Sequence, residues 1–191
     1  MFSVVFASNT FLQMNSKKKI LAICGSTRKL SSNLSLIKVM EQLSVDTFEF
    51  TIFAGLKEIP QFDPDDDHSP APPAVDHFRE LIKLSDAVII CTPEYAMGVP
   101  GSLKNVIDWT VSSAEFMHKP TALITASSQG QKGHAALLET LKIIECEIPE
   151  PIQLLIPFIK TKINAEGKIT HHQTNEELNA LLKALAVLLS K

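Results

Sequence analysis

The chain has 191 residues, of which 45% are hydrophobic and 20% are charged, so it can bury a substantial core and is not a disordered chain. Its 18 basic and 21 acidic residues give a formal net charge of −3, which argues against a sequence-independent nucleic-acid binder. No apolar run approaches the roughly 18 residues that cross a bilayer, so no membrane partner is expected.

The first residues are interpreted as a tail. Residues 1–6 are apolar but lack the charged flank and the length of a signal peptide, and Met14 precedes a lysine-rich stretch and the first convincing strand. We therefore expect a tail over residues 1–18, with residues 1–13 attributed to an over-extended start, and a single domain over residues 19–191.

The three cysteines lie far apart, without the spacing of a disulfide framework or a zinc site. A sparse, odd number of cysteines favours a reducing compartment. We therefore expect a cytoplasmic protein in which Cys24 and Cys91 are buried structural thiols, and we predict no metal site.

Hydrophobic patterning predicts five strands, each followed by a helix. In chain order the expected pairs are Ile20–Cys24 with Asn33–Leu43, Phe48–Ala54 with Ala74–Leu84, Ala87–Thr92 with Ser102–Ser113, Thr121–Ala126 with His134–Glu145, and Ile152–Ile156 with Asn175–Leu189. This alternation is typical of right-handed βαβ units and predicts an α/β fold. We expect a flavodoxin-like three-layer sandwich, with a five-stranded parallel sheet in the order 2-1-3-4-5 and helices on both faces.

The stretch Gly55–Pro73 departs from this alternation and holds five of the chain's 11 prolines. Loops of this length are uncommon and usually functional or disordered, and we expect this one to border the entrance to the site. The run Asp65–Asp67 is interpreted as solvated charge, because no further ligand pattern accompanies it. The pair His171–His172 is interpreted as part of a surface turn.

The sequence places a ligand site at the carboxyl ends of the strands. In the expected order, the loops after strands 1, 3 and 4 lie side by side there, next to the strand-order switch point. Five of the seven glycines fall in these loops, namely Gly25, Gly98, Gly101, Gly130 and Gly133. Glycine tolerates positive φ and lets a ligand approach the backbone, and we expect Gly98 to need one of these properties.

The first of these loops, GSTRKLSSN over residues 25–33, joins a buried strand to a helix. Free N–H groups at a helix N-terminus suit a phosphate, and so does an arginine such as Arg28. The loop matches neither the Walker A nor the Rossmann pattern, and by itself it also fits an ordinary capped turn. In the second loop, Tyr95 and Met97 suit a flat heteroaromatic ligand or ordinary packing.

These residues carry a family resemblance. Residues 25–33 resemble the G-S-x-R-x-x-S-x-N phosphate loop of NAD(P)H-dependent FMN reductases, a family of flavodoxin-like quinone, azo and chromate reductases. Residues 93–109 are similar to the family's P-E-Y-N-x-x-x-P-G-x-L-K-N-x-I-D-W signature, and residues 127–133 resemble its third flavin loop. The chain departs from the pattern at Ala96, where many members have Asn.

The resemblance implies a bound FMN and assigns its contacts residue by residue. The phosphate would be held by Ser26, Arg28, Ser31 and Asn33, with backbone contacts from Ser32 and Leu34. The ring and the ribityl chain would be wrapped by the second loop and approached by the third, through Pro93, Glu94, Tyr95, Ala96, Met97, Gly98, Ser127, Ser128 and Gly130.

The resemblance also implies an activity. NAD(P)H would deliver hydride to the flavin, and the electrons would leave to a quinone, an azo compound, a free flavin or a metal oxyanion. The cofactor supplies this chemistry, so no catalytic residue is expected beyond Tyr95 as a candidate proton donor. We expect an open flavin face, because the flavin-side loops offer no second aromatic ring. Family members are usually dimers or tetramers, and Trp109 is expected in the core or at the subunit interface.

Two other functions are alternatives for this sequence. A flavodoxin-type electron carrier fits poorly, because its first loop typically reads Thr-Gly-x-Thr and its net charge is strongly acidic. The sequence Gly130–Gly133 matches the GxxG clamp of an RNA-binding module, but that clamp belongs to a smaller fold and the chain has no basic excess.

Overall fold

The computed structural model describes residues 16–68 and 70–191, so most of the expected tail lies outside the described residues. The described chain forms one parallel sheet in the order β2-β1-β3-β4-β5. The strands are β1 (Lys18–Cys24), β2 (Phe48–Phe53), β3 (Ala87–Thr92), β4 (Thr121–Ala126) and β5 (Gln153–Ile156). The predicted parallel sheet and its strand order are confirmed.

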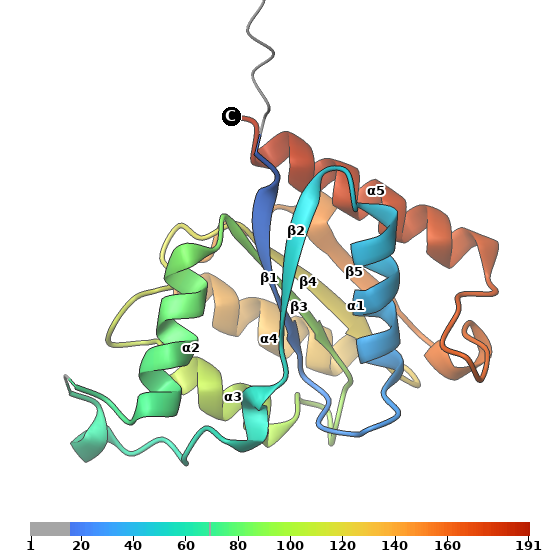
Figure 1. Ribbon diagram of the computed structural model, residues 1–191. Helices are drawn as coiled ribbons and strands as arrows, with labels where there is room; N and C mark the ends of the chain where they lie inside the picture. Colours follow the sequence, from blue (N-terminus) through green and yellow to red (C-terminus); the bar gives the residue numbers. More distant parts are fainter. Residues whose placement is uncertain (1–15, 69) are drawn as a thin grey trace, which may run out of the picture.

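Helices cover both faces of the sheet, as predicted (Figure 1). One face packs against α1 (Ser32–Leu43) and α5 (His172–Leu188). The other packs against α2 (Pro73–Leu84), α3 (Gly101–Asp108) and α4 (Gln131–Ile143). Within the described residues, no helix has the length and hydrophobicity needed to cross a membrane.

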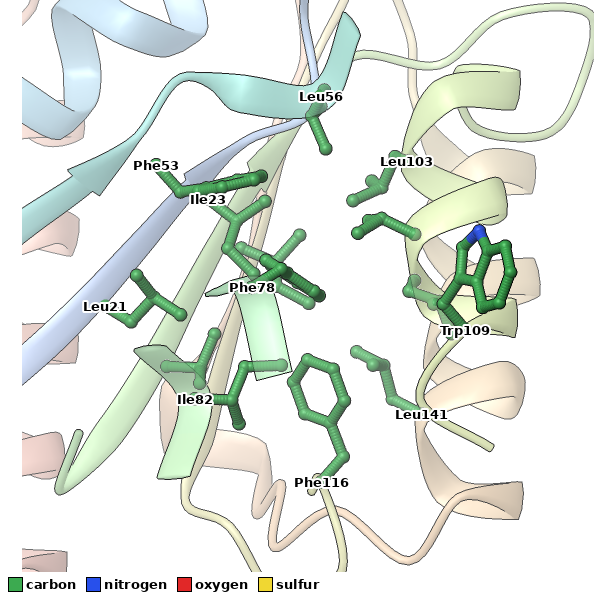
Figure 2. Packing of buried hydrophobic residues seen from close by; sticks show 14 of the residues in the cluster. Leu21, Ile23, Phe53, Leu56, Phe78, Ile82, Leu103, Trp109, Phe116 and Leu141 are labelled. Carbon is green, nitrogen blue, oxygen red and sulfur yellow. The ribbon is translucent and has the colours of Figure 1, made fainter. Parts of the chain in front are cut away.

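The inner strands β3 and β4 are buried at every position, and β1 is buried from Ile20 onward, because both faces of these strands are covered. Along β1, Leu21 and Ile23 belong to the core beneath α2, α3 and α4, whereas Ile20 and Ala22 belong to the core beneath α1 and α5. This split follows from the alternation of side chains along a strand. Figure 2 shows the first core, where aromatic and aliphatic side chains fill the space between the sheet and its helices.

Three cysteines are buried and free, which confirms the prediction for Cys24 and Cys91. Burial raises the pKa of all three thiols, and that of Cys146 rises to about 12. These thiols are therefore protonated and act as small apolar side chains.

The predicted helix over residues 102–113 is wrong at its carboxyl end, because α3 ends at Asp108. At this end the N–H of Thr110 bonds to the carbonyl of Ile107 at 2.9 Å, three residues back, so the helical hydrogen bonding does not continue. Just beyond it, Arg79 of α2 donates to the carbonyl of Trp109, with its Nε at 2.9 Å. Trp109 itself is fully buried, so its predicted place in the core is confirmed.

The interpretation of His171–His172 as a surface turn is also wrong. His171 is the N-cap of α5, and its ring nitrogen Nδ1 accepts a hydrogen bond from the backbone N–H of Thr174 at 3.3 Å. His172 is the first residue of the helix, although both histidines are exposed as expected. Histidine is an uncommon N-cap. The sequence pattern therefore predicted that this helix begins at Asn175, whereas α5 begins at His172.

The proline-rich segment packs against α3. The carbonyl of Pro60 accepts hydrogen bonds from Asn105 Nδ2 and from Trp109 Nε1, both at 2.9 Å. The backbone N–H of Phe62 donates to Asn105 Oδ1 at 2.7 Å, and the Phe62 ring meets the Trp109 ring edge to face. The buried side chain of Asn105 therefore binds the backbone of this loop at both Pro60 and Phe62.

The acidic run in that segment is only partly solvated. Asp65 and Asp66 are exposed as predicted, but the carboxylate of Asp67 is largely buried and lies 2.6 Å from the guanidinium of Arg79. Ser112 Oγ donates to the same carboxylate at 2.6 Å. The hydrogen bond from Ser112, followed by Arg79, lowers the pKa of Asp67. The expectation of a wholly solvated run is therefore wrong at Asp67, where an ion pair anchors the loop.

Candidate functional site

A pocket of about 420 Å³ opens at the carboxyl edge of the sheet, within the size range of small-molecule sites. Its walls come from the loops after β1, β3 and β4, as the sequence predicts, and from the segment after β5. The predicted site residues that line it are Ser26, Arg28, Ser31, Ser32, Asn33, Pro93, Glu94, Tyr95, Ser127 and Ser128.

Five other predicted residues do not line this pocket, namely Leu34, Ala96, Met97, Gly98 and Gly130. Leu34 faces a neighbouring cavity. Gly130 is the N-cap of α4 with φ of 103°, and a Cβ there would lie 2.8 Å from Leu155 Cδ1. Gly130 therefore serves the packing of the loop against β5.

In the first loop, the side chains of two predicted phosphate ligands also hold the loop in place. Ser31 is the N-cap of α1, and its Oγ accepts from the N–H of Leu34 at 3.4 Å. Asn33 Nδ2 donates to the carbonyl of Ala126 at 3.2 Å, and Cys91 Sγ donates to Asn33 Oδ1 at 3.3 Å. Because both ends of the buried Asn33 amide have partners, its side chain positions the loop.

The loop still offers donors to an anion. The backbone N–H groups of Ser32 and Asn33 stand at the start of α1, where the helix supplies no acceptor. The exposed Arg28 and the hydroxyl of Ser26 line the same pocket. This combination of helix N-terminus, guanidinium and hydroxyls suits a phosphate.

The second loop is a tight turn under strain. Tyr95 and Gly98 exchange backbone hydrogen bonds of 3.0 and 2.9 Å. The two residues between them have positive φ, 49° at Ala96 and 63° at Met97. Positive φ costs a non-glycine residue about 1–2 kcal/mol, and asparagine tolerates it better than alanine. The backbone at position 96 is therefore one that favours Asn, the residue that the family pattern has there.

The expectation that Gly98 requires glycine is wrong as regards φ. Gly98 is not among the residues with positive φ, and a Cβ added there would meet only the carbonyl of Tyr95 at 3.7 Å, an ordinary contact. The left-handed residues are the two that precede Gly98. The glycines of the second loop therefore indicated that a ligand loop lies here, but they did not indicate that Ala96 and Met97 have positive φ.

Glu94 docks the second loop onto α4. Its Oε2 accepts from the backbone N–H of Gly133 at 2.7 Å. Gly133 lies in the first turn of α4, where a carboxylate meets the positive end of the helix dipole. A Cβ at Gly133 would lie 2.6 Å from the carbonyl of Gly98. The Glu94 side chain and the absence of a side chain at Gly133 together fix where Tyr95 stands.

Sequence reasoning missed the segment after β5, which contributes Phe158, Ile159, Lys160 and Thr161 to the pocket. The backbone N–H groups of Phe158 and Ile159 donate to the carbonyls of Ser128 and Ser127, both at 3.1 Å. Phe158 has φ of 54° and is 60% exposed, an unusual conformation for a bulky side chain. A second aromatic ring therefore reaches this edge from a segment outside the loops on which the expectation of an open flavin face was based.

One signal could have found this segment. In the order 2-1-3-4-5, β5 is the neighbour of β4, so its carboxyl end also opens on the site. The described residues of the proline-rich segment, by contrast, do not line the pocket. The length of the segment suggested a place at the entrance, but its polar groups pack it on α2 and α3.

The part of the chain that the structure describes holds no group of three or more histidine, cysteine or acidic side chains placed to bind a metal ion. The charged residues of the pocket lining are Arg28 and Lys160, together with Glu94, whose carboxylate is taken by Gly133. The free charge in the pocket is therefore positive.

Comparisons with known proteins match this geometry. A sequence model of the NADPH-dependent FMN reductase family matches residues 18–159. An NAD(P)H-dependent FMN reductase from Pseudomonas aeruginosa is 31% identical over 178 residues, covering 90% of this chain and 95% of that protein. A quinone reductase from Escherichia coli is 29% identical over 179 residues, with coverage of 90% and 95%.

A solved structure agrees with these relatives. The flavoenzyme NAD(P)H:(acceptor) oxidoreductase from Paracoccus denitrificans superposes with a TM-score of 0.80 at 27% identity. The superposition covers 91% of this chain and 97% of the other. The likeness therefore extends over the sheet, the helices and the loops at the carboxyl edge.

Proposed function

This chain belongs to the NADPH-dependent FMN reductase family, and we propose that its pocket binds FMN and passes electrons from NAD(P)H to a quinone. One observation carries the proposal. A single pocket joins the open N–H groups and arginine of the first loop to the exposed rings of Tyr95 and Phe158. A small molecule that carries a phosphate and a flat heteroaromatic ring needs hydrogen-bond donors for the phosphate and aromatic side chains for the ring.

The first loop fits the phosphate of FMN. The N–H groups of Ser32 and Asn33, the Ser26 hydroxyl and the Arg28 fork are donors, and no unpaired carboxylate lines the pocket with them. Ser31 and the Asn33 side chain act indirectly, because they fix the start of α1 against β3 and β4. Because the loop that carries these donors is already ordered, binding an anion does not require a further loss of conformational entropy.

The second and third loops fit the ring. Pro93, Tyr95, Ser127 and Ser128 line the pocket, and the strained turn beside Tyr95 is held by Glu94. FMN held by these residues would supply the redox chemistry between NAD(P)H and an acceptor. The chain's own residues orient the ring and leave room for a second flat molecule, and Tyr95, which is 48% exposed, is the candidate proton donor.

A quinone is the acceptor that this rim favours. Tyr95 and Phe158 are exposed side chains that line the pocket, and the exposed Met97 lies in the same turn as Tyr95. Large exposed apolar groups near a cleft favour an apolar, planar ligand. The alternative of a flavodoxin-type carrier requires a shielded ring, whereas the two aromatic side chains of this pocket, Tyr95 and Phe158, are 48% and 60% exposed.

We place the protein in the cytoplasm as a homodimer or homotetramer. Its free, buried cysteines suit a reducing compartment. Ile143 of α4 is 82% exposed, and Val111 and Met117, which follow α3, are also exposed. Burial of such side chains between copies of the chain would remove apolar surface from water.

The test starts from the purified chain. FMN should bind, as measured by quenching of its fluorescence, and the loaded protein should consume NADPH or NADH when benzoquinone is supplied. The same protein without FMN is the control. A chain that binds FMN but reduces no quinone without a partner protein would support the carrier, and a chain that binds no FMN would contradict both functions.

A further inference from the structure

A second cavity of about 440 Å³ adjoins the flavin pocket. Leu30, Ser31, Ser32 and Lys160 line both cavities. The second cavity therefore begins where the proposed phosphate site ends, on the far side of the start of α1. Its size falls within the range of small-molecule sites.

One wall of this cavity is formed by a segment that packs tightly against α1. The segment between β5 and α5, drawn in orange beside α1 in Figure 1, forms a small hairpin in which Ile163 pairs with Ile169. Gly167 of this hairpin has φ of 78°, and a Cβ there would lie 2.7 Å from Ser35 Oγ of α1. The hairpin thus packs directly on α1 through a residue that has no side chain.

The lining is rich in positive charge. Lys29 of the first loop, Lys38 of α1 and Lys160 after β5 all face the cavity, against the single carboxylate of Glu166. Among the described residues, none of these three lysines forms an ion pair. Three exposed cations brought together from separate elements repel one another unless an anion lies between them.

We infer that this cavity binds the adenosine diphosphate half of a dinucleotide. The inference rests on the proposed function, because the cavity continues from the site assigned to the flavin phosphate. The lysines suit a second phosphate, and the serine hydroxyls and Leu30 suit a nucleoside. Two ligands carry this group to this place: FAD, in which it is joined to the flavin phosphate, and NAD(P)H.

The first experiment measures binding of adenosine diphosphate to the FMN-loaded protein by calorimetry. We expect binding, and we expect Lys38→Glu to weaken it about tenfold or more, because an attraction becomes a repulsion. Lys38→Ala should act in the same direction with a smaller effect. Lys183→Glu on α5 is the matched control, since it makes the same charge change on an exposed helical lysine and should leave binding unchanged.

Two further measurements identify the ligand. If the cavity serves the flavin, the apoprotein binds FAD, and Lys38→Glu weakens FAD but not FMN. If it serves the electron donor, Lys38→Glu raises the KM for NADPH and leaves kcat unchanged. No binding of adenosine diphosphate to the wild-type chain, or equal binding by Lys38→Glu, would overturn the inference. Failure of FMN to bind the wild-type chain would instead contradict the proposed function.

Discussion

At the scale of single residues, Arg28 is the exposed cation of the first loop. We predict that Arg28→Ala weakens FMN binding by about 10- to 150-fold, because a hydrogen bond to a charged group contributes about 1.5–3 kcal/mol. Fluorescence titration measures the affinity, and the far-UV spectrum should not change, since Arg28 has no place in the core. Arg28→Lys should recover part of the loss. Equal affinity for FMN in the alanine variant would show that backbone N–H groups hold the phosphate alone.

The backbone conformation of Ala96 predicts how substitutions there change the free energy of unfolding. Its φ of 49° disfavours alanine, and we predict that Ala96→Asn raises the free energy of unfolding by about 0.5–1 kcal/mol. Ala96→Val, which adds a β-branched side chain at the same φ, should lower it. Urea denaturation of the three proteins measures both changes. Valine and asparagine variants of equal stability would mean that the turn relaxes to another conformation.

At the scale of elements, the contact between the second loop and α4 depends on Gly133. A Cβ at this position would lie 2.6 Å from a backbone carbonyl, so Gly133→Ala must separate the loop from the helix. We predict a loss of about 1–3 kcal/mol in stability together with weaker FMN binding. Thermal unfolding and FMN titration are the measurements.

Gly101→Ala provides a matched control for that prediction. Gly101 also opens a helix, but a Cβ there would meet nothing within 4 Å. This variant should be neutral or more stable, because alanine has less conformational freedom to lose on folding. If both glycine variants lost the same stability, the cause would be the helix starts themselves and not the contact with the second loop.

The elements also show what the sequence can and cannot predict. Strands β3 and β4 lie where apolar runs predicted them, because a strand covered on both faces leaves a continuous local signal. The end of α3 was not predicted, because the apolar spacing does not show that the N–H of Thr110 bonds to the carbonyl of Ile107 instead of that of Val106. The place of Phe158 was not predicted either, since nothing local shows that its backbone N–H donates to the carbonyl of Ser128. A contact between distant segments decides that position.

At the scale of the whole molecule, His134 links stability to pH. Its ring is half-buried at the start of α4, with Nδ1 3.0 Å from Thr125 Oγ1, and burial lowers the pKa of His134 below its ordinary value of 6.5. Below pH 6.5 the unfolded chain therefore binds a proton that the folded chain does not. The stability that depends on the neutral ring is present above pH 6.5 and is lost as the pH falls toward the folded pKa.

We predict that His134→Gln makes the free energy of unfolding less dependent on pH in this window, because glutamine can contact Thr125 but does not titrate. Urea denaturation of wild type and variant at a series of pH values gives the two curves. For His77→Gln on α2, which replaces an exposed histidine, the free energy of unfolding should depend on pH as it does in wild type.

The same protonation should affect the flavin pocket. The second loop contacts α4 through Glu94 and Gly133, so protonation of His134 should destabilise both the helix and the pocket wall that rests on it. FMN affinity should then fall with pH in wild type and less so in His134→Gln, and equal slopes in the two proteins would contradict this link.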